Sequence, residues 1–295
     1  MSVFVQQQHS INDFSSADSW VILSEIELSI KRKIEAVGTP LKDWDIQIYR
    51  GVLTGYNEAF IISTEKRDKI LANCQNEEER AKTAELIRPI LRGRDIKRYG
   101  YDWAGLWLIN THNGVKGVKP RIDINDYPAV KQHLDKYWDK ISKRADKGDT
   151  PYNLRNCAYV DDFNQPKICW KAVGKNLTFA VVESGVFLTA PASFISANKY
   201  NNYITAFLCS NVAKYFIYKN SDTTGAGDIM LNIQSLIRFP VPIPDSKLQD
   251  EIEKIVSSIS DCLPQENQVN QKLLNDMIYR LYQFNKQEIT FIESI

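Results

Sequence analysis

The sequence predicts an α+β fold: a mixed sheet with inserted helices, extended by further helices at both ends of the chain. Two patterns carry this prediction. Short apolar stretches bounded by turn residues fill the middle of the 295 residues, as expected of strands. Apolar residues at helical spacing fill both ends. Apolar residues make up 43% of the chain and charged residues 25%, which is typical of a globular protein with a buried core.

The N-terminal end is expected to hold a polar leader, residues 1–19, followed by a helix. Ser19 could cap a helix that starts at Trp20, and Gly38 with Pro40 would end it. The apolar residues of this helix recur every three or four positions: Leu23, Ile26, Ile30, Ile34 and Val37. Such a narrow seam is typical of a helix that packs against another helix.

Short stretches in the middle of the chain have the composition of strands. They are rich in β-branched and aromatic residues and are bounded by turn residues. These stretches are residues 46–52, 58–63, 105–110, 157–160, 167–173, 178–183 and 186–190. A polar bend at residues 54–57 separates the first two.

Two helices are expected between these strands. Asn76 and Glu79 are placed to cap the first, and Pro89 would end it because proline lacks the backbone donor that a helix needs. Pro128 suits the first turn of the second helix. Its apolar side chains should face one way: Val130, Leu134, Trp138 and Ile141. The polar residues 141–155 should then form an exposed loop.

A largely buried helix and an extended exit are expected after the strands. Apolar residues from Tyr203 to Phe216 mark the helix, and residues 221–228 predict a flexible turn. The proline-rich residues 239–244 predict a rigid extended segment. We expect the main domain, residues 20–245, to end there.

Residues 246–295 are predicted to form a helical extension. Ser246 with Gln249 could cap its first helix, and Asn285 with Glu288 its last. A second seam consists of Leu248, Ile252, Ile255, Ile259 and Cys262, and a third of Val269, Leu273, Met277 and Leu281. The second seam could lie antiparallel to the N-terminal one, which would pair the two ends of the chain.

Charge is unevenly distributed along the chain, although the net charge is only +1. Residues 88–175 contain 18 Lys and Arg against 10 Asp and Glu. Residues 1–87 contain 10 against 14, and residues 245–295 contain 5 against 9. A basic block between acidic ends is typical of a localised nucleic-acid-binding surface.

Residues 87–101, IRPILRGRDIKRYGY, hold a dense group of cations within this block. Pro89 and Gly93 favour a turn, and Tyr99 and Tyr101 lie among the cations. Cations interleaved with aromatic residues suit a phosphate backbone. The alternative is a surface loop whose arginines pair with nearby acids. The candidate phosphate ligands are Arg88, Arg92, Arg94, Lys97 and Arg98.

An ordered series of segments carries a family resemblance: residues 50–62, 107–114, 127–134, 146–159, 166–170 and 239–244. In this order they resemble the TaqI-like C-terminal specificity domain of bacterial restriction–modification enzymes. The resemblance extends from about Trp20 to the C-terminus. The enzymes that carry this domain are fused adenine-N6 DNA methyltransferases or methyltransferase–endonucleases of type IIG.

The resemblance implies a target-recognition domain that selects the duplex DNA sequence which a methyltransferase part modifies. That part would be fused to the domain or supplied by a separate subunit. The helices at both ends would set distance and orientation, as spacer helices do in related type I specificity subunits.

The polar loops offer side chains that can read bases. Arg and Lys recognise guanine in the major groove, and Asn and Gln recognise adenine. Gly114 and Gly117 would let residues 113–121 approach a duplex closely. Each such residue by itself is ordinary on a surface, but as a group beside the basic block they favour DNA. The candidates are Asn57, Asn113, Lys116, Lys119, Arg121, Asn153 and Arg155.

The motifs of catalysis are missing from the sequence. An adenine methyltransferase needs a glycine-rich turn for S-adenosylmethionine and an Asn/Asp-Pro-Pro-Tyr/Phe motif, and neither occurs. Gly225 and Gly227 follow a predicted helix, where they predict a loop. The Ser motif of α/β-hydrolases is absent too. We expect no catalysis and no cofactor in this chain. The resembled full-length enzyme would use S-adenosylmethionine and could use magnesium.

The sequence also bears on location and on alternative functions. There is no run of 18 apolar residues and no signal peptide, and the five cysteines and three histidines are scattered. We therefore expect a cytoplasmic protein without a metal site or a membrane partner. One alternative is a protein–protein adaptor with incidental DNA contact. Another is a cryptic metal-dependent nuclease, for which Asp161, Asp162 and Lys167 offer the nearest acidic cluster.

Overall fold

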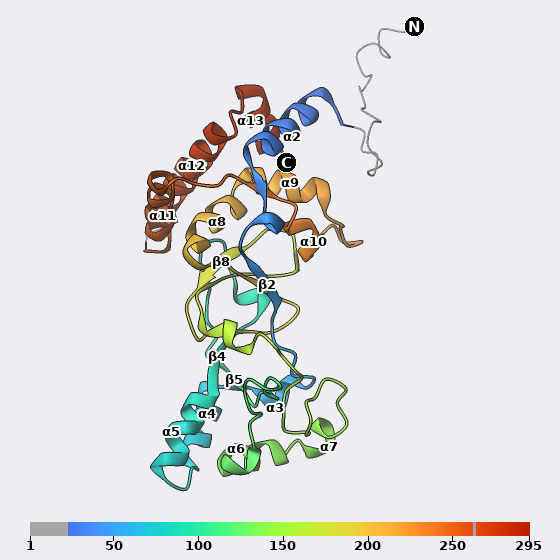
Figure 1. Cartoon of the computed structure of the whole chain (residues 1–295), viewed down its shortest axis with the longest axis vertical. Coiled ribbons are helices and arrows are strands. Elements are labelled where there is room, and N and C mark those ends of the chain that lie inside the picture. The colour runs from blue at the N-terminus through green and yellow to red at the C-terminus, as the bar shows by residue number, and fades with distance from the viewer. Residues whose placement is uncertain (1–22, 262–263) are drawn as a thin grey trace. The chain divides into compact units, whose positions relative to one another are not determined.

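The computed structural model describes residues 23–261 and 264–295, which group into two compact units. Unit 1 comprises the described residues of Met1–Trp44, Ala206–Ser221 and Gln234–Ile295. Unit 2 comprises Asp45–Thr205 and Asp222–Ile233. Residues from both ends of the chain therefore share unit 1 (Figure 1). The predicted divide between residues 245 and 246 falls inside it.

Unit 2 is built on two four-stranded sheets, and its main strands are the regions of high β-propensity. The first is antiparallel, in the order β2 (Gln47–Arg50), β10 (Ser193–Ser196), β6 (Lys167–Trp170) and β8 (Phe179–Val182). The second has the order β3 (Ile61–Ser63), β5 (Leu106–Ile109), β4 (Ile87–Leu91) and β9 (Phe187–Leu188). Strand β4 pairs antiparallel with β5 and parallel with β9. The predicted α+β class with a mixed sheet is confirmed.

Short elements complete unit 2. A two-stranded pair joins β7 (Val173–Gly174) to β11 (Ile229–Met230). The helices are α3 (Asn57–Phe60), α4 (Thr64–Ala72), α5 (Glu77–Leu86), α6 (Pro128–Asp135) and α7 (Trp138–Ile141). Single 3₁₀ turns lie at Gly93–Asp95, Ile124–Asp126, Val160–Asn164 and Asn198–Tyr200. Helix α8 (Asn201–Leu208) runs from unit 2 into unit 1.

Aromatic side chains fill the core of unit 2. Phe163 stacks on Phe187 with ring centroids 4.5 Å apart and lies 4.8 Å from the ring of Phe194. All three are at most 2% exposed. Phe187 belongs to one four-stranded sheet and Phe194 to the other, so this cluster packs the two sheets together.

Unit 1 is mostly helical. Strand β1 (Thr39–Pro40) pairs antiparallel with β12 (Pro240–Val241), and a 3₁₀ turn follows at Leu41–Asp43. The other elements are α2 (Glu25–Val37), α9 (Asn211–Asn220), α11 (Ser246–Asp261), α12 (Pro264–Leu281) and α13 (Lys286–Glu293). The short helix α10 (Ile233–Leu236) begins where the chain returns to this unit.

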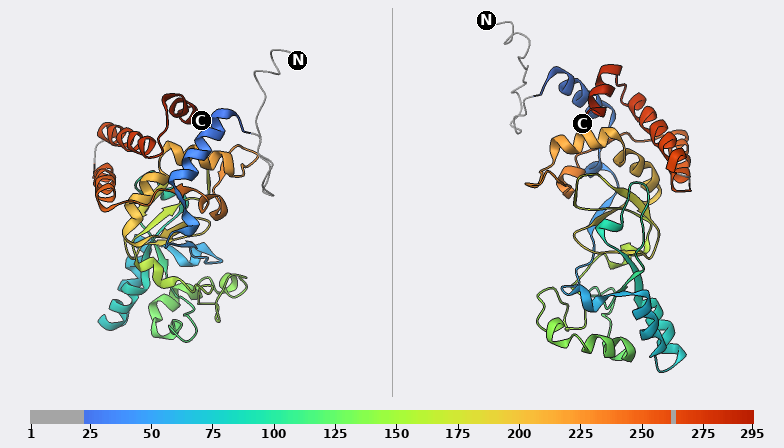
Figure 2. Two further views of the ribbon diagram at one scale, coloured as in Figure 1. Left: turned by 45° about the horizontal axis from the view of Figure 1, so that its top comes forward. Right: turned by 180° about the vertical axis from the view of Figure 1, so that it is seen from behind.

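The predicted pairing of the two seams is wrong. Among the described residues, α11 packs along α12, and α2 lies beside α13 (Figure 2). Only two residues separate α11 from α12, so closing this helical hairpin costs less chain entropy than a contact over more than 200 residues. Ile30 and Ile34 of α2 are buried as expected.

Several helix boundaries differ from the prediction. The predicted Ser19 cap and Trp20 start lie outside the described residues, and α2 begins at Glu25 after Ser24. The Glu27 carboxylate accepts hydrogen bonds from the Ser24 N–H (2.9 Å) and hydroxyl (2.7 Å). Asp245, and not Ser246, caps α11, because its carboxylate accepts the Leu248 N–H at 2.8 Å.

Two predicted helices are each broken into two. The helix expected at 128–141 divides into α6 and α7. Trp138 is 44% exposed and so does not share the buried face of Val130, Leu134 and Ile141 as expected. The helix expected at 203–216 divides into α8 and α9, because the Ser210 hydroxyl accepts the Ala213 N–H and starts a new helix. On α12, Leu274 and Ile278 are buried, whereas Val269 and Leu273 of the predicted seam are exposed.

Three other predictions also need correction. Residues 58–60 are helical in α3, and residues 157–160 form a turn followed by a 3₁₀ segment instead of a strand. Strand β10 was not predicted.

The caps at Asn76 and Asn285 are confirmed, since each side chain accepts the N–H of the glutamate three residues later. In the described part of the chain, no helix is long and apolar enough to cross a membrane.

Candidate nucleic-acid interface

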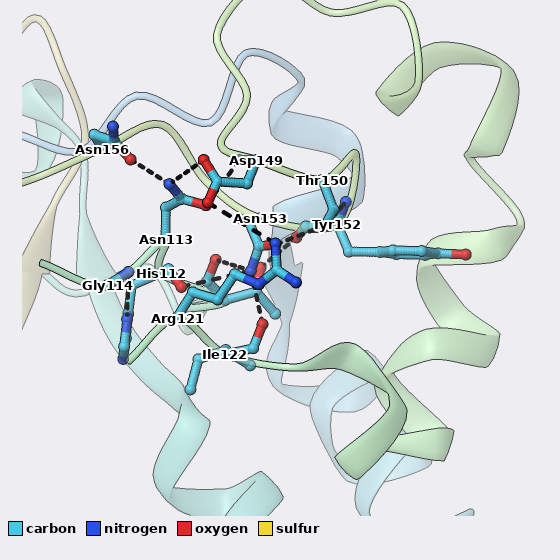
Figure 3. A network of polar contacts seen from close by, with 11 residues as sticks. His112, Asn113, Gly114, Arg121, Ile122, Asp149, Thr150, Tyr152, Asn153 and Asn156 are labelled. Atoms are coloured by element: carbon cyan, nitrogen blue, oxygen red, sulfur yellow. Dashed lines mark hydrogen bonds and ion pairs between the residues drawn. The ribbon is translucent and has the colours of Figure 1, made fainter. Parts of the chain in front are cut away.

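Two polar loops of unit 2 are joined side by side through Asn113 (Figure 3). The Asn113 amide nitrogen donates to the Asp149 carboxylate at 3.0 Å, and its oxygen accepts the Asp149 N–H at 2.8 Å. The same nitrogen donates to the side-chain oxygen of Asn156. Asn113 therefore joins the loop after β5 to the loop after α7. The structure brings these predicted regions together from a distance of more than 30 residues in sequence.

The tip of the first loop is a tight hairpin. The Lys119 N–H donates to the Val115 carbonyl at 2.9 Å, and Gly114 and Gly117 have φ angles of 72° and 77°. At Gly114 a Cβ would lie 2.4 Å from the Lys119 carbonyl oxygen, so only glycine fits. Lys116 is exposed at this tip, where the loops border an open hollow of about 710 Å³.

His112 supports the base of this hairpin. Burial, helped by the nearby Lys119 charge, lowers the pKa of His112 below its usual value. Its imidazole is therefore neutral at pH 7, and Nδ1 can accept the Gly114 N–H at 3.1 Å. His112 therefore has a structural role at the base of the hairpin.

The second loop is organised by two buried side chains. Arg144 is 7% exposed, and its guanidinium donates to the carbonyls of Thr54, Asp146, Pro151 and Asn153. It also lies 4.4 Å from the centroid of the Phe60 ring. Because the Thr54 carbonyl belongs to the 54–57 bend, Arg144 fixes that bend against the loop. The expectation that residues 141–155 form an exposed loop needs correction, because this loop contains the buried side chains of Arg144 and Asn153.

Asn153 cannot reach a base as predicted, because it is 1% exposed. Its amide nitrogen donates to the Ile122 carbonyl at 2.9 Å, and its oxygen accepts the Thr150 hydroxyl at 2.6 Å. A buried amide must satisfy its hydrogen bonds within the protein. Asn153 therefore ties its loop to the loop after β5.

The remaining predicted base readers lie on the surface. Arg121 pairs with Asp149 at 3.8 Å, Arg155 with Asp146 at 2.8 Å, and Lys119 with Asp161. Asn57 is exposed, and its side-chain oxygen accepts the Thr54 hydroxyl at 2.5 Å. Exposed ion pairs contribute about 0–1 kcal/mol, so these cations can exchange a carboxylate for a phosphate or a base at little cost.

The predicted cationic turn at 87–101 divides into a strand and a turn. Residues Ile87–Leu91 form β4 with Ile87, Ile90 and Leu91 in the core, and α5 ends at Leu86, before Pro89. Arg88 lies within β4 and donates at 3.4 Å to the Gly185 carbonyl and to the Asn164 side chain. Sequence reasoning missed this strand because arginine and proline interrupt its apolar pattern.

Arg92 forms an ion pair with a buried acid. Its guanidinium donates to Asp95 at 2.7 and 3.0 Å, and its backbone N–H donates at 2.8 Å. Burial alone would raise the pKa of Asp95, but the bonds from Arg92 outweigh burial and hold that pKa below its usual value. Arg92 thus matches the alternative considered for this stretch, in which an arginine pairs with a nearby acid.

The other three cations of the stretch are more accessible. Arg94 and Lys97 are exposed, and Lys97 approaches Asp102 at 3.6 Å. The Arg98 guanidinium lies 5.4 Å from the centroid of the Tyr99 ring. These three can still meet a phosphate.

Candidate metal ligands and cysteines of the described residues are scattered. No group of three or more His, Cys, Asp or Glu side chains is placed to hold a metal ion there. Within the same residues, Cys74, Cys157, Cys169 and Cys209 form no disulfide bond. Lys167 is fully buried and donates to the carbonyls of Phe163 and Gln165, so it closes a turn.

Comparison with known proteins gives one family match and two sequence relatives. A model of the TaqI-like C-terminal specificity domain matches residues 88–241. The type II methyltransferase M.BstVI of Geobacillus stearothermophilus is 24% identical over 289 residues, which cover 95% of this chain and 47% of that protein. The type II methyltransferase M.PaeR7I of Pseudomonas aeruginosa is 21% identical over 286 residues, covering 93% and 44%. The chain thus spans about half the length of these relatives.

Two solved structures share the fold at 14% identity. The match to the type IIL restriction–modification enzyme MmeI in complex with DNA has a TM-score of 0.61. It covers 87% of this chain and 36% of the MmeI chain. The type IIG restriction endonuclease BpuSI has a TM-score of 0.50 and covers 88% and 33%.

Proposed function

The chain belongs to the family of TaqI-like C-terminal specificity domains, and on that premise we propose that it recognises a specific sequence of duplex DNA. The domain would direct an adenine-N6 methyltransferase part, supplied in the same polypeptide or by a separate subunit. That part, and not this chain, would hold S-adenosylmethionine and any magnesium. This chain would contribute recognition without catalysis.

The observation that carries the proposal is the pair of loops joined by Asn113. Base recognition requires donors and acceptors held in fixed positions at the surface of a rigid scaffold. Here Asn113, Arg144 and Asn153 use buried or half-buried polar groups to fix the loops. The loops then display exposed cations and amides around an open hollow.

We assign the predicted site residues to three roles. Lys116, Lys119, Arg121, Arg155 and Asn57 contact base edges. Arg94, Lys97 and Arg98 contact phosphates, as does Arg88 on β4, an inner strand of the second sheet. Asn113, Asn153 and Arg92 act indirectly, by holding loops and turns in place.

Selection from a random duplex pool tests the proposal. The full chain should enrich one sequence, and it should bind that duplex at least about ten-fold more tightly than a scrambled one, since one mismatched base pair costs roughly 1–3 kcal/mol. Lys116→Gln should weaken binding to the enriched duplex and leave the scrambled duplex nearly unaffected. Lys247→Gln, at an exposed position of α11, is the matched control.

Binding that enriches no sequence would refute sequence recognition. Absence of any duplex binding would favour the adaptor alternative. Cleavage of the pool in the presence of magnesium would favour the nuclease alternative.

A further inference from the structure

The segment around α7 of unit 2 carries three cations that are not among the predicted site residues. Lys136 directly follows α6, Lys140 lies in α7 and Lys143 follows α7, and all three are exposed. No described carboxylate lies within ion-pair distance of any of the three. We call these residues the lysine row. Three cations so close in sequence, without paired acids, concentrate positive charge on this part of the surface.

The acids near the row do not neutralise it. Asp135 is occupied, because it accepts bonds from Lys131 at 2.8 Å and from the Tyr152 hydroxyl at 2.5 Å. Asp146, beyond the other end of the row, pairs with Arg155 at 2.8 Å. Asp139 is the acid between the lysines, and it leaves a positive surplus along α7.

Two hollows adjoin the row, one at Lys136 and one at Lys140 and Lys143. One, of about 310 Å³, lies between α4 and α6 and is lined by Lys66, Lys69 and Lys136, with no carboxylate in its lining. The other, of about 490 Å³, is lined by Lys140 and Lys143 on one side and by Gly55 and Tyr56 on the other, with Asp139 as its acid. Both hollows suit an anion.

The second hollow connects the row to the proposed base-reading surface. Gly55 and Tyr56 belong to the bend that ends at Asn57, and Arg144 fixes this bend by a bond to the Thr54 carbonyl. A polyanion held by Lys140 and Lys143 would therefore lie next to Asn57. A duplex offers such an arrangement, since its phosphates flank each groove.

We propose that the lysine row binds the sugar–phosphate backbone of duplex DNA while the neighbouring loops read its bases. This inference rests on the proposed function and adds a phosphate-binding surface separate from residues 88–98. The row contributes affinity without sequence information, because phosphates are alike in every sequence.

The test compares two triple variants of the full chain. K136Q/K140Q/K143Q removes the row, and K247Q/K254Q/K272Q removes three exposed lysines of α11 and α12 in unit 1. Both lose the same net charge. Affinity for a random-sequence duplex and for the duplex enriched from a pool is measured over a series of salt concentrations. Circular dichroism melting checks that both variants fold.

Loss of the row should lower the slope of log K against log salt by roughly 2–3 units, at about 0.9 per phosphate contact. The affinities for both duplexes should fall by the same factor, so the preference between them stays constant. The control triple variant should keep the wild-type slope.

An unchanged slope in the row variant, or an equal change in the control, would overturn the inference. So would a loss confined to the enriched duplex, since that would mean base contact. The proposed function is judged separately from wild type: if the wild-type chain prefers one sequence and the row variant binds as wild type does, only this inference fails.

Discussion

Arg92 and Arg94 are separated by one glycine and have different environments. Arg92 is 27% exposed in its side chain and forms a two-pronged pair with Asp95, which is 5% exposed. Arg94 faces solvent. The sequence shows two equivalent arginines in a basic stretch, because it does not show that Asp95 turns inward at the 3₁₀ turn Gly93–Asp95. Burial of the acid decides which arginine is structural.

Arg92→Ala should lower the free energy of unfolding by about 1–3 kcal/mol at pH 7, because it leaves a buried carboxylate without its donors. In the wild type the pKa of Asp95 is held low by Arg92 against the effect of burial. This stabilisation is present above the unfolded-state pKa and is lost as pH falls through the folded-state pKa. The difference between variant and wild type should therefore shrink below about pH 4.

Urea unfolding at neutral and acidic pH measures both effects. Arg94→Ala is the matched control and should change stability by less than about 0.5 kcal/mol. Equal losses for the two variants would show that the Arg92–Asp95 pair does not stabilise the turn.

Elements were predicted best where local signals are strong. Asn76 and Asn285 identified helix starts because a side-chain cap depends only on residues within one turn. The breaks at Lys136–Tyr137 and at Ser210 were missed, since apolar spacing continues across them. Strand β10 was missed because it depends on partner strands that are distant in sequence. The pairing of α11 with α12 was missed because the periodicity of a helix does not show which other helix it packs against.

Helix α2 is joined to α13 through one buried acid. Glu288 is 2% exposed in its side chain, and it accepts the Lys33 ammonium at 2.7 Å and the Ser29 hydroxyl at 2.6 Å. A double-mutant cycle with Lys33→Met and Glu288→Gln should give a coupling energy of about 1–3 kcal/mol. On the same α2 helix, the exposed pair Lys31–Glu35, at 3.8 Å, should give about 0.5 kcal/mol or less.

Denaturant melts of the single and double variants provide both cycles. A Lys33–Glu288 coupling no larger than the Lys31–Glu35 coupling would mean that the buried contact does not hold the two helices together.

At the scale of the whole molecule, the family resemblance was more informative about function than the composition of the sequence. The ordered segments from Arg50 to Pro244 indicated the family, and the family match at residues 88–241 agrees with them. The sequence identified the loops at 113–121 and 146–155 as candidates, and in the structure Asn113 joins the two loops. Which of their side chains face outward could not be read, because burial of Asn153 and exposure of Lys116 depend on the folded path of both loops.

The uneven distribution of charge leads to a prediction about pH. The sequence pI is about 7.6, so net charge turns negative above that pH. The usual pKa of lysine is about 10.4 and that of arginine is above about 12, both well above this pH, so a basic surface of exposed lysines and arginines need not follow the net charge. Burial also raises the pKa of Cys157 to about 11, so this thiol beside the loops stays neutral.

Binding of a random-sequence duplex should therefore change by less than about three-fold between pH 7 and pH 8.5, although the net charge changes sign. Raising the salt concentration should weaken binding equally at both pH values, because the same phosphate contacts are screened. Fluorescence anisotropy at constant ionic strength measures this directly. An affinity that falls in step with net charge would mean that the overall charge of the protein attracts DNA, and that unit 2 presents no localised basic surface.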